Sequence, residues 1–196
     1  GNEEVLFLKE NDYLIDFSKI DKNIAKKARF MVVSYPNNPT CGIANDEFYL
    51  NLIQFAKEND IIVLHDNAYS ELLFETPGKS FLSYPEAKEV GIEFNSLSKT
   101  YGLAGARIGF AVGNSKIIKQ IKTLKSNIDY GMFIPIQLAA IEAITGDQLC
   151  VEQTRDAYKK RRDAFLINAK KLVGKLIKPK VLCLFGQKYL ISIRHH

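Results

Sequence analysis

Short apolar runs alternate along this chain with longer segments in which apolar residues return every three or four positions. Four of the runs predict buried strands, at residues 30–34, 61–65, 92–95 and 108–112. The runs do not alternate apolar with polar residues, which is typical of strands in a parallel sheet that is covered on both faces. With helices between the strands, the pattern predicts an α/β fold: a mostly parallel sheet flanked by helices.

The first helical segment lies between the first two runs. Its apolar residues recur with a period near 3.6: Phe48, Leu52, Phe55 and Ala56. This spacing predicts a helix over Asp46–Asn59, with Asn45 or Asp46 as its N-cap.

The second half of the chain is predicted to be largely helical. Ser115 is a suitable cap for a helix with four apolar residues on one face: Ile117, Ile118, Ile121 and Leu124. Pro135 suits the first turn of the next helix, and Gly146 suits its end. A long helix is predicted over residues 148–173, ended by Gly174.

Polar side chains follow the predicted strands in a regular order. Asn38 lies in the loop after the first strand, Asp66 and Tyr69 follow the second directly, and Lys99 lies just beyond the third. In open parallel sheets, ligands bind at the carboxyl ends of the strands. We therefore expect these side chains to border one ligand site.

The loop after the third strand carries the most distinctive motif. In residues 96–100 (SLSKT), Lys99 stands between hydroxyl side chains, and Arg107 follows eight residues later. An amine forms an imine with an aldehyde, while hydroxyl and guanidinium groups bind a phosphate dianion. The combination indicates a cofactor that carries both an aldehyde and a phosphate, namely pyridoxal 5'-phosphate (PLP).

These motifs resemble the fold-type I, PLP-dependent aminotransferases of class I/II. The spacings agree with that family: 28 residues separate Asn38 from Asp66, and eight separate Lys99 from Arg107. Three segments resemble the subgroup of LL-diaminopimelate and aspartate aminotransferases: residues 35–40, 96–101 and 126–133. The resemblance extends over about residues 1–180.

The resemblance implies a catalytic role for three residues. Lys99 would bind the aldehyde carbon of the cofactor and then act as general base and acid. Asp66 would keep the pyridine nitrogen protonated, so that the ring withdraws electrons from the substrate. Tyr69, together with Asn38, would hydrogen-bond the ring hydroxyl oxygen.

The same resemblance implies a phosphate site made by Ser96, Ser98 and Arg107. Two further residues leave alternatives open. Tyr130 either borders the active site or dimer contact, or packs as an ordinary tyrosine. His65 either supports the neighbouring aspartate by a hydrogen bond, or is a core histidine.

As a member of this family, the protein would transfer an amino group between an amino acid and a 2-oxo acid. The subgroup favours LL-diaminopimelate with 2-oxoglutarate, or an aspartate- or alanine-like pair. Two alternatives stay open: a PLP-dependent lyase or synthase on the same fold, and a catalytically inactive fragment. The relatives also imply a homodimer.

The resemblance predicts a division at about residue 150: a partial PLP-binding large domain over 1–150, and the interdomain helix with the start of a small domain over 151–196. Relatives are about twice this length, so the chain resembles a truncated form. Cys41 stands where the family has glycine. Residues 181–196 depart from the family pattern, and a one-base frameshift in the gene would explain this tail.

Composition narrows the remaining possibilities. The net charge is only +5, and the lysines are spread over predicted helices, so nucleic-acid binding is not expected. Three widely spaced cysteines give no metal-binding pattern and fit a reducing cytoplasm. No run approaches the length of a membrane span, so no membrane association is expected.

Overall fold

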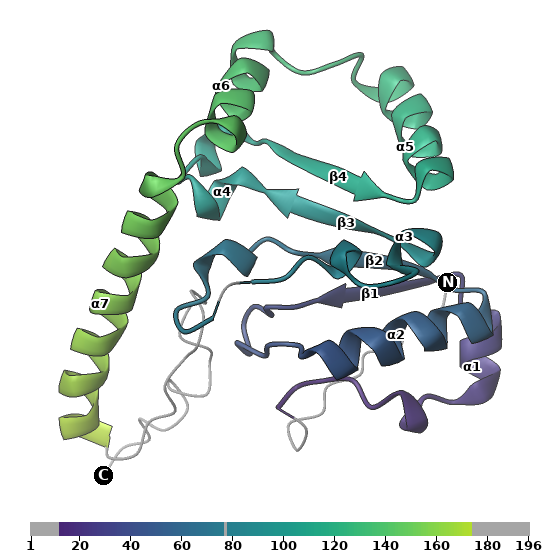
Figure 1. The fold of residues 1–196 in the computed structure, drawn as a ribbon, viewed down its shortest axis with the longest axis horizontal. Helices are drawn as coiled ribbons and strands as arrows, with labels where there is room; N and C mark the ends of the chain where they lie inside the picture. Colours follow the sequence, from purple (N-terminus) through teal and green to yellow (C-terminus); the bar gives the residue numbers. More distant parts are fainter. Residues whose placement is uncertain (1–11, 77, 174–196) are drawn as a thin grey trace.

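The fold was analysed in a computed structural model, which describes residues 12–76 and 78–173 (Figure 1). Its strands are β1 Phe30–Ser34, β2 Ile62–Asp66, β3 Gly91–Ser96 and β4 Gly109–Gly113. Its α-helices are α1 Lys22–Lys27, α2 Asp46–Asn59, α3 Ala87–Val90, α4 Leu97–Thr100, α5 Ser115–Ile128, α6 Ile134–Thr145 and α7 Leu149–Val173. Short 3-10 turns are η2 Phe17–Lys19, η3 Ser70–Leu72, η4 Phe81–Ser83 and η5 Ala104–Ala106.

The four strands form one sheet in the order β1-β2-β3-β4. The first three are parallel, and β4 runs antiparallel to β3. The chain turns back at the carboxyl end of β3, so that Ser96 pairs with Gly109. The predicted α/β class and mostly parallel sheet are confirmed, and each predicted strand agrees with an observed one to within a residue at either end.

Helix α2 has the predicted bounds because both of its ends carry a local signal. The side chain of Asn45 accepts a hydrogen bond from Phe48 N at 2.8 Å, which caps the amino end. At the other end, Asp60 adopts the left-handed conformation, with φ of 52°. The apolar face of α2, with Leu52 fully buried, packs on the sheet.

The largest hydrophobic cluster of the described residues lies on one face of the sheet. Val33 and Val63 point into it, beneath α2, α3 and η4. On the opposite face, Phe30 is 61% exposed, Val32 71% and Phe94 39%. The predicted coverage of both faces is therefore only partly met among the described residues: Ile92, on the same face as Val32, is fully buried, whereas Phe30 and Val32 are exposed.

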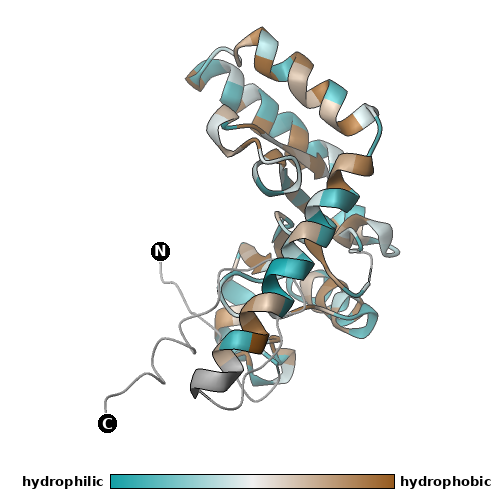
Figure 2. Ribbon diagram, turned by 90° about the vertical axis from the view of Figure 1, so that its left-hand side faces the viewer, coloured by the Kyte–Doolittle hydropathy of each residue, from teal (hydrophilic) through white to brown (hydrophobic). Residues whose placement is uncertain are grey.

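The later helices largely agree with their sequence signals. The N-cap of α5 is Asn114, whose side chain accepts hydrogen bonds from two backbone N–H groups; the predicted cap, Ser115, is the first helical residue. Helix α6 has Pro135 in its first turn and Gly146 as its C-cap, as predicted. Figure 2 shows hydrophobic residues on this helix, at the end of the molecule away from α2.

Helix α7 runs as a long rod along one side of the molecule (Figures 1 and 2). Its predicted stop, Gly174, and the divergent tail both lie outside the described residues. Arg162 of α7 is almost fully buried and contacts both Glu75, at 3.2 Å, and the ring of Phe74, at 4.5 Å from its centroid. Among the described helices, none is long and apolar enough to cross a membrane.

Candidate active site

The strand register brings the predicted polar residues to one edge of the sheet. Asp66 is the last residue of β2, and it pairs with Ser34 of β1 and Phe94 of β3. Strands lie about 4.8 Å apart and rise about 3.3 Å per residue, so the Cα atoms of Asp66 and Ser96 lie about 8 Å apart. The carboxylate of Asp66 is exposed at this edge, where a ligand can reach it.

Asp66 has one neighbour that the sequence did not single out. The hydroxyl of Ser34 donates a hydrogen bond to Asp66 Oδ2, at 3.4 Å. The signal for it was available, because Ser34 ends the first apolar run just as Asp66 ends the second. A length of 3.4 Å marks a weak hydrogen bond, so Ser34 does little to fix the direction of the Asp66 carboxylate.

Asn38 and Tyr69 come together from two separate loops. Asn38 Nδ2 donates a hydrogen bond to Tyr69 Oη at 3.1 Å. Asn38 is exposed and Tyr69 half-buried, so their polar ends face the solvent edge of the sheet. Two donors at this distance are able to share one acceptor oxygen, as the proposed contact with the cofactor's ring hydroxyl requires.

Lys99 lies in the short helix α4, directly after β3. It is exposed and makes no ion pair within the described residues. The hydroxyl of Ser96 caps α4 by accepting a hydrogen bond from Ser98 N at 3.1 Å. The Ser96 hydroxyl proton and the half-buried Ser98 hydroxyl remain as donors in the segment that leads into the lysine.

Arg107 lies close to these serines in the chain fold. Leu97 N donates to Ile108 O at 3.3 Å, which holds the segment with Arg107 beside the start of α4. Arg107 Nη1 donates to Ala104 O at 3.1 Å, and its other guanidinium donors are exposed. Arg107 also has a left-handed backbone, with φ of 54°.

A buried polar cluster lies under this edge, and sequence reasoning missed it. His65 is fully buried, with Nε2 3.1 Å from Tyr49 Oη and Nδ1 3.4 Å from Glu93 Oε2. Burial raises the pKa of Glu93, but hydrogen bonds from His65, Asn95 and Asn67 outweigh burial and lower it to about 2. His65 is thus a core histidine, as one of the two sequence interpretations held.

The structure also bears on two other residues named from the sequence. Tyr130 is 91% exposed, so the interpretation as a packed tyrosine is wrong. Cys41 has φ of 60°, the left-handed conformation that explains why glycine suits this position. Its side chain packs against Leu73, as those of Ile43 and Tyr69 do, next to the candidate site.

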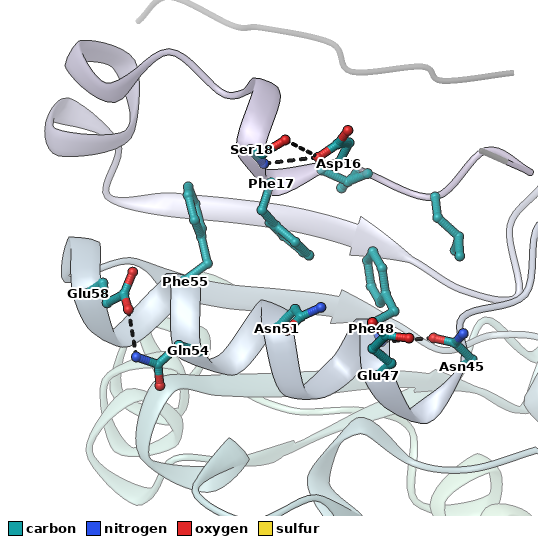
Figure 3. A pocket seen from close by; sticks show the side chains of 12 residues that line it. Asp16, Phe17, Ser18, Asn45, Glu47, Phe48, Asn51, Gln54, Phe55 and Glu58 are labelled. Carbon is teal, nitrogen blue, oxygen red and sulfur yellow. Dashed lines mark hydrogen bonds between the residues drawn. The ribbon is translucent and has the colours of Figure 1, made fainter. Parts of the chain in front are cut away.

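A hollow of about 550 Å³ lies elsewhere, on the outer surface of α2 (Figure 3). Several of its polar side chains are already paired with one another. Asp16 accepts hydrogen bonds from Ser18, and Gln54 donates to Glu58 at 2.6 Å. The chemistry expected from the sequence therefore lies at the sheet edge, and this hollow has no part in it.

Comparison with known proteins agrees with the chemistry expected at this edge of the sheet. Residues 3–192 match the family described as aminotransferase class I and II. The chain belongs to this family. The resemblance to class I/II aminotransferases is confirmed, and solved structures of aminotransferases share its fold.

The relatives are considerably longer than this chain. It is 46% identical over 170 residues to an LL-diaminopimelate aminotransferase of Halothermothrix orenii, covering 86% of this chain and 44% of that protein. Its identity to transaminase BacF of Bacillus subtilis is 43% over 178 residues, covering 90% and 45%. The solved structure of substrate-bound BacF superposes with a TM-score of 0.87, over 89% and 45% of the two chains. The chain thus spans less than half the length of these relatives.

The residues at the sheet edge fit PLP by the chemistry of their donors. Asp66 offers an exposed carboxylate for a ring nitrogen. The Asn38–Tyr69 pair offers two donors for a ring oxygen. The segment from Ser96 to Arg107 offers an amine for an aldehyde and hydroxyl and guanidinium groups for a phosphate. All three groups are reached from the carboxyl ends of β1, β2 and β3.

Proposed function

We propose that this protein is a PLP-dependent aminotransferase, which moves an amino group between an amino acid and a 2-oxo acid. The observation that carries the proposal is the sheet edge on which Asp66, the Asn38–Tyr69 pair and the Lys99 loop lie at neighbouring strand ends. Membership of the aminotransferase family supports it. When bound, PLP supplies an aldehyde for amine capture and a ring that withdraws electrons from the substrate carbon.

Each residue of the chain has a defined task in this proposal. Lys99 Nζ would hold the cofactor through its aldehyde group, and the amine would carry a proton to and from the substrate carbon. Asp66 holds a proton on the ring nitrogen through its carboxylate. Asn38 and Tyr69 orient the ring by hydrogen bonds to its hydroxyl oxygen.

The phosphate contacts complete the proposed site. Ser96 and Ser98 donate through their hydroxyls, and Arg107 donates through its guanidinium. These three residues flank Lys99 in the chain, so they place the aldehyde within reach of its amine. Orientation of two reacting groups is a large part of what an enzyme contributes to rate.

For the substrate, we propose LL-diaminopimelate with 2-oxoglutarate as the acceptor. Several relatives at 40–46% identity carry the name LL-diaminopimelate aminotransferase, which supports this choice. The similarity to BacF, at 43% identity, supports another amino donor as a second candidate. A panel of amino donors, each assayed with 2-oxoglutarate by glutamate formation, decides between them.

We further propose the domain division and the assembly expected from the sequence. Residues 1–150 form part of the PLP-binding large domain, and 151–196 contain the interdomain helix with the start of the small domain. The protein forms a homodimer in the cytoplasm. Sedimentation velocity tests the dimer: a single boundary at the mass of one chain, 22.2 kDa, would contradict it.

The direct test of the proposed function is titration of the purified chain with PLP, followed by addition of an amino acid. We expect a visible absorption band that saturates with PLP and disappears when the amine donor is added, with a 2-oxo acid as the product. Lys99→Ala is expected to abolish the band. Ammonia or a thiol as product would instead identify the lyase alternative, and no band with the wild-type chain would identify an inactive fragment.

A further inference from the structure

Asp66 is flanked in the chain by two buried residues, His65 and Asn67, and His65 lies beside the buried carboxylate of Glu93. Side chains alternate along a strand, so His65 and Asn67 point away from Asp66, into the core. Both are buried, at 0% and 4% exposure. His65 Nδ1 lies 3.4 Å from Glu93 Oε2, and Asn67 is tied to β3 by its backbone N–H, which donates to Phe94 O at 2.9 Å.

Glu93 is itself fixed from several directions. It pairs with His65 across β2 and β3 and is only 2% exposed. Its Oε2 accepts a hydrogen bond from Phe81 N at 2.7 Å, and its Oε1 accepts one from Asn95 Nδ2 at 3.0 Å. Ser80 Oγ lies 3.0 and 3.1 Å from the two oxygens. A buried carboxylate with so many donors is held rigidly, because each donor restricts its direction.

His65 is held on its other side as well. Its Nε2 lies 3.1 Å from Tyr49 Oη, and its ring stacks on Phe81 with centroids 5.6 Å apart. Burial, with smaller charge effects, raises the pKa of the Tyr49 phenol far above its ordinary range, so the phenol keeps its proton for this contact. The backbone on both sides of Asp66 is therefore anchored in the core.

The carboxylate of Asp66 has no comparable support of its own. It is exposed, and its hydrogen bond from Ser34 is 3.4 Å long. Its direction must therefore come mainly from the backbone beneath it.

We propose that Glu93 and His65 are positioning residues, which fix the direction of the Asp66 carboxylate by holding the residues on either side of it. This inference rests on the proposed function, in which Asp66 holds a proton on the cofactor's ring nitrogen. A shift of the carboxylate by about 1 Å weakens such a contact strongly, because charge-assisted hydrogen bonds depend on short distances.

The test measures the protonation of the ring nitrogen directly. The chain is loaded with PLP labelled with ¹⁵N in the ring, and the nitrogen chemical shift is followed against pH. Asp66→Asn gives the full effect of losing the carboxylate. We expect Glu93→Gln and Asn67→Ala to lower the pH at which the nitrogen loses its proton, by about one unit or more for Glu93→Gln.

Asn67→Ala is the sharper variant, because it leaves the charge of Glu93 in place. Any shift that it causes reports the position of Asp66 and not the loss of a buried charge. Asn67 Oδ1 has no hydrogen-bond partner among the described residues, so the variant removes a buried oxygen whose hydrogen bonding is not satisfied. Asn67→Ala therefore also serves if Glu93→Gln does not fold.

Core variants away from Glu93 are the matched controls. Ile53→Val serves as the control for Asn67→Ala, and Leu52→Ala serves as the control for Glu93→Gln. Both controls lie in α2 and lower the free energy of unfolding by packing alone. The inference predicts unchanged nitrogen titration in both controls. If the controls shift the titration as much as their partners do, or if Asn67→Ala shifts nothing, the positioning role is overturned while the proposed function stands. If the wild-type chain does not bind PLP at Lys99, the proposed function fails and this inference fails with it.

Discussion

At the scale of single residues, Cys41 shows strain next to the candidate site. It has φ of 60° in the tight loop from Asn37 to Gly42, which two backbone hydrogen bonds of 2.9 Å close. An L-residue in this conformation costs about 1–2 kcal/mol, whereas glycine adopts it freely.

This strain predicts the relative stability of two variants. Cys41→Gly and Cys41→Ala both lose the sulfur contacts, but only glycine relieves the backbone. We therefore expect Cys41→Gly to be more stable than Cys41→Ala by about 1 kcal/mol in urea unfolding. Equal stability of the two variants, or a more stable alanine variant, would show that the loop carries no such strain.

Tyr69 offers a second prediction at this scale. Its phenol is half-buried and contacts Asn38 at the surface, so Tyr69→Phe should change the free energy of unfolding by less than about 0.5 kcal/mol. The proposed contact with the ring hydroxyl oxygen is nevertheless lost. We expect the pH at which the bound cofactor changes colour to rise by about one unit, measured by absorbance. An unchanged colour transition would place the phenol away from the ring.

At the scale of elements, Glu93 links β2, β3 and η4, and its ionisation links their stability to pH. Its pKa in the folded protein is about 2, below the ordinary value of 4.5. The unfolded chain therefore takes up the proton first when pH falls. The contribution of Glu93 is fully present above about pH 4.5 and is lost as pH falls toward about 2.

Glu93→Gln should remove this part of the pH dependence. We expect the variant to be less stable than the wild type by about 3 kcal/mol at pH 7, and the difference to shrink between pH 4.5 and 2. Urea unfolding at a series of pH values measures it. Glu58→Gln, an exposed change on α2, should keep the wild-type pH profile. A constant difference between Glu93→Gln and wild type at all pH values would contradict the ionised, buried carboxylate.

The attachment of α7 gives a matched pair of adjacent arginines. Arg162 is buried against Glu75 and Phe74, while Arg161 is exposed and lies over Tyr158. We expect Arg162→Ala to cost about 2 kcal/mol and to speed hydrogen exchange along α7, because the buried contacts of the guanidinium with Glu75 and the Phe74 ring are lost. Arg161→Ala should cost less than about 0.5 kcal/mol. Similar costs for both would mean that α7 is not anchored through Arg162.

At the scale of the whole molecule, much of the fold followed from local signals. The bounds of α2 were predictable because an asparagine cap and a regular apolar face mark them. The site residues were predictable because strand ends in parallel sheets meet at one edge, so Asp66 and Ser96 had to be neighbours. The resemblance to aminotransferases came from motifs, and the family match agrees with it.

Other features depend on contacts that a local pattern does not contain. The reversal of β4 is invisible in an apolar run, which has no direction. Glu93 and His65 interrupt their strands as polar residues, and only the register shows that they lie side by side in the core. The open face with Phe30 and Val32 could not be predicted either, because the same run suits a strand covered on one face or two.

The central claim is that Lys99, among the many lysines of this chain, is the one that binds PLP. Incubation with PLP, reduction with borohydride and peptide mass spectrometry test it most directly, with Asp66→Asn as a comparison. We predict that the reduced cofactor is attached to Lys99 at stoichiometric amounts, and at lower occupancy in the variant. Attachment spread evenly over the surface lysines, or an unmodified Lys99, would contradict the account.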